Sequence, residues 1–142
     1  AAPMSSPYDK QITSIAVVSE TEFLVGYGTG KVKDWSSITR ESSKTIEAYS
    51  KGSSVTGIRV HKSNTSTSVF YTVSNSEPDI KIWKLKDFSL IGKLDTNKTQ
   101  VKRLYLVSET NHLIASTRSS ELILYDLLSR TKVKVFSGRT SY

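Results

Sequence analysis

The stretch Ile80-Lys81-Ile82-Trp83-Lys84-Leu85 is a short run in which apolar and polar residues alternate before an aromatic residue. A period of two residues predicts a β-strand with one buried face. Related runs occupy residues 32–35 and 122–127. Their aromatic residues, Trp35, Trp83 and Tyr125, lie 48 and 42 residues apart. This spacing indicates that the chain is built from a repeated unit.

Twelve strand-like runs fall into three groups of four, separated by clusters of Gly, Ser, Thr, Asn and Asp, as expected of turns. The expected strands are 12–18, 22–27, 31–35 and 44–48, then 55–61, 69–73, 80–85 and 90–94, then 101–107, 112–116, 122–127 and 132–136. The groups begin at Ile12, Val55 and Val101, which lie 43 and 46 residues apart. Four short strands in each repeat of roughly 40 to 50 residues are typical of a β-propeller blade.

At these residues the chain resembles the WD40-repeat family. The third strand of each family repeat ends in an apolar-x-apolar-Trp-Asp pattern, which residues 80–85 and 122–127 match in part. The first copy is degenerate, because Asp34 stands where the family has an apolar residue. The first strands, at 12–17, 55–60 and 101–106, follow the family's Val-x-x-apolar-x-apolar pattern. The resemblance covers residues 10–137.

The chain also departs from the family pattern. The Gly-His pair that precedes the first strand is absent, and the Asp of the turn before the third strand is missing from the first and third repeats. In the second repeat Asp79 stands near that place, directly after Pro78. The buried Asp–His–Ser–Trp network of well-matched repeats is therefore not expected to be complete. A different antiparallel sandwich or barrel is the alternative fold.

The predicted fold is all-β: a WD40-like β-propeller segment of about three four-stranded antiparallel blades, incomplete as a closed ring. The blades are expected at 10–51, 52–98 and 99–137, between a flexible N-terminal segment, 1–9, and a flexible tail, 138–142. The resemblance implies that Trp35, Trp83 and Tyr125 form the inter-blade core. Three blades would leave two apolar faces uncovered. Another chain, a second copy or a longer parent protein is expected to supply the missing blades.

Composition excludes several classes of site. The 142 residues contain no cysteine, which excludes disulfides, thiolate zinc sites and a cysteine nucleophile. No apolar run approaches the roughly 18 to 20 residues of a membrane span. His61 and His112 have no metal-ligand spacing, and the glycine-rich segment 26–30 precedes a strand, so it predicts a turn and not a phosphate loop. We therefore expect no enzyme, no cofactor, no metal site and no small-molecule substrate.

The net charge is the one sequence signal for a partner. Lys and Arg number 20 against 13 Asp and Glu, which gives +7 at pH 7. The blade assignment places Lys51, Lys98 and Arg118 in loops on one rim, with Lys102 and Arg103 on the strand beside it. These five are the candidate partner-binding residues, for an acidic peptide or nucleic-acid phosphates. The alternative is that the basic residues form a solvated outer face.

The resemblance implies a non-catalytic protein–protein interaction scaffold that is a subunit of a larger intracellular complex, cytoplasmic or nuclear. The alternative function is a basic propeller surface that associates with nucleic acid in a ribonucleoprotein or chromatin complex. The salt dependence of binding separates the two hypotheses.

Overall fold

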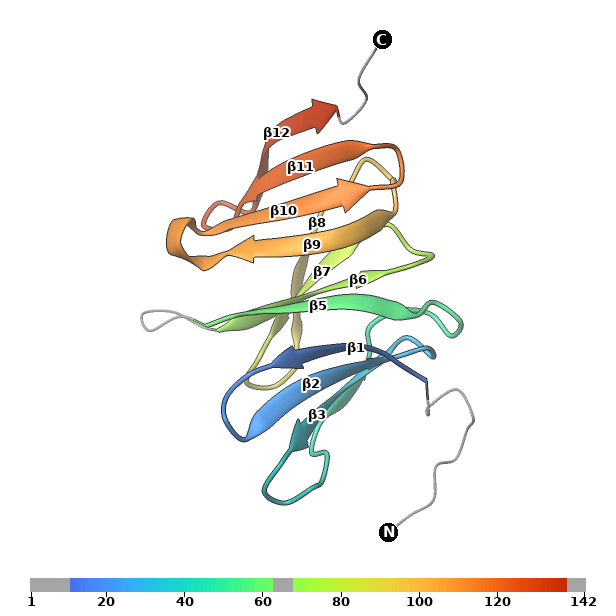
Figure 1. Cartoon of the computed structure of the whole chain (residues 1–142), viewed down its shortest axis with the longest axis vertical. Helices are drawn as coiled ribbons and strands as arrows, with labels where there is room; N and C mark the ends of the chain where they lie inside the picture. Colours follow the sequence, from blue (N-terminus) through green and yellow to red (C-terminus); the bar gives the residue numbers. More distant parts are fainter. Residues whose placement is uncertain (1–10, 63–67, 138–142) are drawn as a thin grey trace.

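Twelve strands form three four-stranded antiparallel sheets in the computed structural model, which describes residues 11–62 and 68–137 (Figure 1). Sheet 1 contains β1 (Ile12–Val17), β2 (Glu22–Tyr27), β3 (Lys31–Ser36) and β4 (Thr45–Glu47). Sheet 2 contains β5 (Val55–His61), β6 (Val69–Ser74), β7 (Ile80–Lys84) and β8 (Leu90–Leu94). Sheet 3 contains β9 (Val101–Val107), β10 (His112–Thr117), β11 (Glu121–Asp126) and β12 (Thr131–Ser137). The prediction of three groups of four antiparallel strands is confirmed; the segments expected to be flexible, 1–9 and 138–142, lie outside the described residues.

The three sheets share the same irregularities. The first strand of each sheet carries a β-bulge at its second residue, so that Thr13, Thr56 and Lys102 have no partner in the adjacent strand's register. Sheets 2 and 3 also share a bulge between their third and fourth strands, at Ile91 and Val133. Bulges at matched positions show that the repeat extends to backbone geometry, beyond the hydrophobic pattern.

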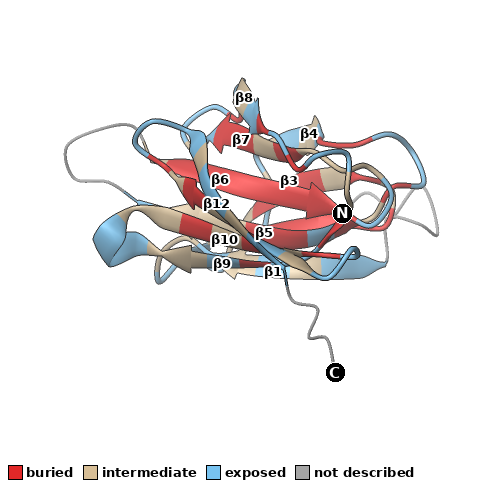
Figure 2. Cartoon of the chain, turned by 90° about the horizontal axis from the view of Figure 1, so that it is seen from above, coloured by how far each residue is buried: buried red, intermediate tan, exposed pale blue. Residues whose placement is uncertain are grey.

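The sheets stack face to face, with sheet 2 in the middle, as Figure 1 shows. One core lies between sheets 1 and 2 and contains Leu24, Val32, Val55, Ile58, Phe70, Trp83 and Phe88. The other core lies between sheets 2 and 3 and contains Tyr71, Ile80, Ile82, Leu104, Leu113, Ile123 and Tyr125. All six residues of β6 are buried (Figure 2), because both faces of sheet 2 are covered.

Gly26 permits the close approach of sheets 1 and 2. A Cβ atom at this position would lie 2.8 Å from Cβ of Val55. Such a separation is a clash, so any larger residue would push β2 away from β5.

The three repeat aromatics do not have equivalent surroundings. Trp83 is buried between sheets 1 and 2, and Tyr125 is buried between sheets 2 and 3. Trp35 is only half-buried, contrary to expectation. It pairs with Phe23 on β2, whereas the adjacent Leu24 faces sheet 2, so Trp35 lies on the outer face of sheet 1. No described sheet packs on that face, which is why the same repeat position is not enclosed there.

A buried hydrogen-bond network links sheet 2 to the connection that precedes it. The Trp83 indole N–H donates to the Thr72 hydroxyl (2.9 Å), and that hydroxyl donates to the Tyr49 hydroxyl (3.2 Å). The Tyr49 oxygen lies 2.7 Å from the carbonyl oxygen of Thr72 and 2.8 Å from that of Asp79. Burial raises the pKa of the Tyr49 phenol well above its usual range, so the group remains a neutral donor.

Candidate functional site

Three of the five predicted partner-binding residues lie in loops, and the other two lie on the strand beside those loops. Lys51 lies in the β4–β5 connection, Lys98 in the β8–β9 connection and Arg118 in the β10–β11 turn. These connections lie at the same end of the stack, on the right in Figure 1. Lys102 and Arg103 lie in β9.

The loops at that end carry both signs of charge. The carboxylate of Glu77 accepts a hydrogen bond from the backbone N–H of Ser50 (2.7 Å). Asp95 forms an ion pair with Lys132 (3.3 Å). Because Glu77 of the β6–β7 connection lies beside the Lys51 loop and Asp95 belongs to the Lys98 loop, the loops do not form a continuous basic surface.

The structure also brings Lys102 and Arg103 together with Arg59, which the sequence did not single out. These three residues line a cleft of about 370 Å³ between β5 and β9, which we call the basic cleft. Its other lining residues are Thr56, Gly57, Val73, Leu104 and Tyr105. The only sequence signal for Arg59 is that it is the one Lys, Arg, Asp or Glu in its strand.

Arg59 is held in place by backbone oxygens. Its Nε–H donates to the carbonyl of Leu104 (3.0 Å), and Nη1 donates to the carbonyl of Ile58 (2.8 Å). The first bond crosses from sheet 2 to sheet 3. A guanidinium has five N–H donors in a planar fork, so it can bind an anion while it stays anchored.

The strands that form the edge containing the basic cleft carry no Asp or Glu, although Glu121 lines a neighbouring pocket with Lys102 and Arg103. Figure 2 shows β1, β5 and β9 along one side of the molecule, opposite β4 and β8. We call β1, β5 and β9, the first strands of the three sheets, the inner strands. Their residues include two Arg and one Lys but no Asp or Glu. Neighbouring cations repel one another, and a bound anion relieves that repulsion. The basic cleft is therefore suited to a carboxylate or phosphate group.

Two kinds of feature are missing from the part of the chain that the structure describes. It contains no group of three or more His, Cys, Asp or Glu side chains that could hold a metal ion. Within the same residues, no helix has the length and apolar character needed to cross a bilayer.

Comparison with known proteins supports the fold alone. No family model matches the chain, and no curated protein matches it. Among solved structures, the chain is similar to the crystal structure of the computationally designed Ika8 protein, with a TM-score of 0.73 and 16% identity over 92% of this chain and 37% of that chain. It is also similar to the computationally designed Ika4 protein, with a TM-score of 0.74 and 16% identity over 92% of this chain and 75% of that chain. The chain thus spans little more than a third of the length of Ika8.

Proposed function

We propose that the chain is a segment of a WD40-like β-propeller and acts as a non-catalytic scaffold for protein–protein interaction within a larger intracellular complex. The repeated sheets, with bulges at matched positions, support the propeller assignment. So does the network of Trp83, Thr72 and Tyr49. Tyr49 stands in the connection before β5, the first strand of sheet 2, and the family has a histidine before the first strand of a repeat.

The observation that carries the scaffold proposal is the pair of apolar faces at the ends of the stack. On the outer face of sheet 1, Ile15 is 59% exposed and Val17 is 73% exposed. On the outer face of sheet 3, Leu122 is 41% exposed and Phe136 is 44% exposed. Contiguous apolar surface of this kind marks contact with other protein. Further sheets, from another chain or from the same protein, are the proposed cover.

Light scattering coupled to gel filtration tests this proposal. The isolated chain is expected to associate, so its mass will exceed 15.8 kDa and will rise with concentration. A Val17→Glu, Leu122→Glu double variant removes apolar contact at both ends and is expected to lower the association. Lys51→Glu and Arg118→Glu, which change exposed rim charges, serve as the control pair. A stable monomer at every concentration contradicts the proposal.

The basic cleft is the proposed site for an acidic segment of a protein partner. Nucleic acid is a second candidate, because the inner strands carry cations without carboxylates. Fluorescence anisotropy with an oligoglutamate peptide and with a single-stranded RNA oligonucleotide separates the two candidates. RNA binding that is strong at about 50 mM salt and falls steeply by about 200 mM supports nucleic acid. RNA that fails to bind at low salt contradicts it.

The same assay locates the ligand. An Arg59→Gln, Lys102→Gln variant removes two charges from the basic cleft. A Lys51→Gln, Arg118→Gln variant removes two charges from the rim loops and is the matched control. Equal losses of affinity in both variants would mean that net charge alone is responsible, and would overturn the assignment to the cleft.

A further inference from the structure

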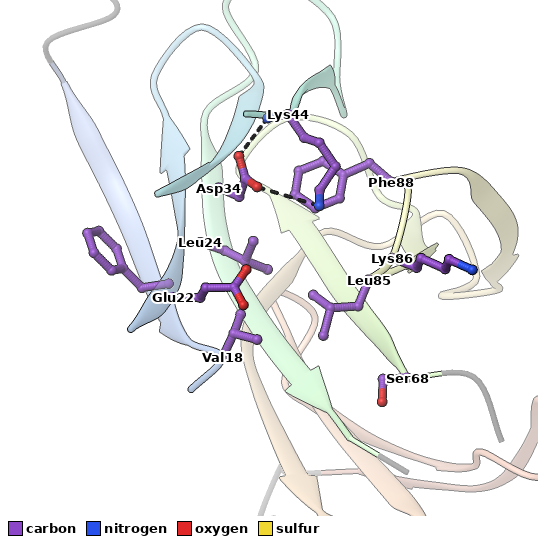
Figure 3. A pocket seen from close by; sticks show the side chains of 10 residues that line it. Val18, Glu22, Leu24, Asp34, Lys44, Ser68, Leu85, Lys86 and Phe88 are labelled. Atoms are coloured by element: carbon purple, nitrogen blue, oxygen red, sulfur yellow. Dashed lines mark hydrogen bonds and ion pairs between the residues drawn. The ribbon is translucent and has the colours of Figure 1, made fainter. Parts of the chain in front are cut away.

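A groove opens between sheets 1 and 2 at the end of the stack opposite the rim loops (Figure 3). Its volume is about 420 Å³. Apolar side chains of Val18, Leu24, Leu85 and Phe88 line it. Charged residues from both sheets stand among them: Glu22 and Lys44 belong to sheet 1 and its loops, and Lys86 belongs to the β7–β8 turn. The groove therefore combines an apolar floor with polar edges.

Phe88 forms the floor in an unfavourable backbone conformation. It has a φ of 61°, in the left-handed region that L-residues rarely adopt. Arg40 and Arg130 have the same conformation at matching turn positions, with φ of 60° and 57°, but both are exposed. Phe88 is buried, with its ring centroid 5.0 Å from that of Phe70 in an edge-on arrangement. Only the turn of sheet 2 thus directs an aromatic ring between two sheets, and strained residues of this kind often mark functional sites.

Lys44 is fixed at the edge of this floor. Its Nζ lies 3.5 Å from the Asp34 carboxylate and 5.3 Å from the centroid of the Phe88 ring. Asp34 in turn accepts hydrogen bonds from the backbone N–H groups of Ser43 (2.9 Å) and Lys44 (2.6 Å) and from the Ser43 hydroxyl (2.7 Å). Asp34, the residue that departs from the repeat pattern, therefore positions a cation beside an aromatic surface.

We propose that this groove binds a partner's short acidic segment through one inserted aromatic side chain. The groove lies near the lower end of the roughly 300 to 1,000 Å³ of ligand cavities in proteins, and this volume accommodates one large side chain. An aromatic side chain is favoured over an aliphatic one, because it can pack on the Phe88 ring and lie near the Lys44 ammonium.

The two edges of the groove differ in charge, with Glu22 on the sheet 1 side and Lys86 on the sheet 2 side, so the carboxylates of the ligand are placed beside Lys86. Asp34 is already satisfied by donors within its own loop, and Figure 3 shows Lys86 extending from the mouth of the groove, away from Asp34. A carboxylate next to the inserted ring can therefore pair with Lys86. The net charge of +7 also favours the approach of an acidic segment.

The probe is a fluorescein-labelled seven-residue peptide that carries one phenylalanine between two pairs of aspartates, with glycine at each end. We expect saturable binding by fluorescence anisotropy. Replacement of the phenylalanine by alanine is expected to weaken binding at least tenfold. Replacement of the four aspartates by lysines is expected to abolish it. Equal binding of the alanine peptide, or no binding of the original peptide at millimolar protein, overturns the proposal.

Two variants place the peptide on the protein. Leu85→Glu puts a charge into the groove and is expected to abolish binding, provided that circular dichroism shows the native fold. Lys86→Glu changes an exposed turn residue without touching the core and is expected to weaken binding about fivefold to tenfold. Lys51→Glu makes the same charge change at the far end and is the matched control. If Lys51→Glu weakens binding as much as Lys86→Glu does, the groove is not the site.

The Arg59→Gln, Lys102→Gln variant separates this proposal from the basic cleft. It is expected to leave binding of the phenylalanine peptide within twofold. A loss of binding in that variant, with no loss in Lys86→Glu, would assign the peptide to the cleft and overturn the groove proposal. If the cleft variant loses oligoglutamate binding but still binds the phenylalanine peptide, the two ligands bind at separate sites, as proposed.

Discussion

Trp83 and Trp35 hold the same place in the repeat but have different energetic roles. Trp83 is 6% exposed and donates its indole N–H to Thr72, whereas Trp35 is half-buried and donates to the hydroxyl of Tyr27. Removal of a buried aromatic side chain leaves a cavity, and at Trp83 it also removes the donor to the buried Thr72 hydroxyl.

We therefore expect Trp83→Ala to lower the free energy of unfolding by about 3 to 5 kcal/mol. Trp35→Ala is the matched comparison and should cost about 1 to 2 kcal/mol, because less apolar area is lost. Urea denaturation of both variants measures the difference. A small loss for Trp83→Ala would show that its ring is not enclosed in solution.

Asp34 makes the stability of the β3–β4 connection depend on pH. Burial opposes ionisation of this carboxyl, but hydrogen bonds from Ser43 and Lys44, together with the Lys44 charge, outweigh it and hold the pKa below the ordinary value of 3.8. A carboxyl whose pKa is lowered on folding stabilises the fold above the unfolded pKa. This stabilisation is lost as the pH falls through the lower, folded pKa.

Asp34→Asn is expected to cost about 1 to 2 kcal/mol at pH 7, and less as the pH falls below 3.8. Glu41→Gln, at an exposed carboxylate in the same connection, is the control and should change little. Urea titrations at about pH 7 and about pH 3 measure both effects. An Asp34→Asn penalty that is independent of pH would show that the charge of the carboxylate is unimportant.

Side-chain partnerships were the part of the site that sequence reasoning missed. Arg59 contacts Leu104, 45 residues away, and Tyr49 contacts Thr72, 23 residues away. No pattern among neighbouring residues in the sequence indicates either contact, because each depends on how segments far apart in the chain pack together. The partial exposure of Trp35 was missed for a related reason: the repeat pattern does not say which sheet has a neighbour.

The turns between third and fourth strands show how one backbone conformation can serve different purposes. Arg40, Phe88 and Arg130 are all in the left-handed region, where glycine is the least strained residue. Arg40 is exposed, so its side chain contributes little packing energy to offset the backbone strain. Phe88 fills space between sheets 1 and 2.

Glycine substitutions are therefore expected to have opposite effects at these two positions. Arg40→Gly should stabilise the protein by about 0.5 to 1 kcal/mol, because it removes the strain of a positive φ. Phe88→Gly should destabilise it by about 3 to 5 kcal/mol, because the buried ring is lost. Thermal unfolding of the two variants measures both changes. A stabilising Phe88→Gly would show that the ring contributes less than the strain.

The strands were the part of the fold that the sequence predicted well. Alternation of apolar residues located all twelve strands, because period two survives wherever one face is buried. The bulges were not predicted. At Thr56 the extra residue resets the alternation, so that Gly57 and Ile58 are both buried in succession. A broken period in a single sequence is indistinguishable from the end of a strand.

At the scale of the whole molecule, the charge distribution is one-sided. The inner strands carry cations without carboxylates, whereas lysines of β8 and β12 pair with carboxylates of the loops, as at Lys93–Asp79 and Lys132–Asp95. Any ligand that binds the folded state alone stabilises that state by mass action.

Tripolyphosphate, a compact polyanion, is expected to raise the Tm by about 3 to 6 °C at roughly ten times its Kd, relative to sodium chloride of equal ionic strength. The increase should disappear in the Arg59→Gln, Lys102→Gln variant and persist in Lys51→Gln, Arg118→Gln. Differential scanning calorimetry measures the shift. An increase that survives in the cleft variant would place the polyanion elsewhere.

The stacked arrangement makes the chain a linear array in which each sheet contacts only its immediate neighbours. Sheet 2 has two neighbours, whereas sheets 1 and 3 each have one. In such arrays stability is close to a sum of unit and nearest-neighbour terms, so the ends fray before the middle. Backbone amides in β6 and β7 should therefore exchange with deuterium last, and those of β1 and β12 first. Docking a further sheet on either end would slow exchange at that end.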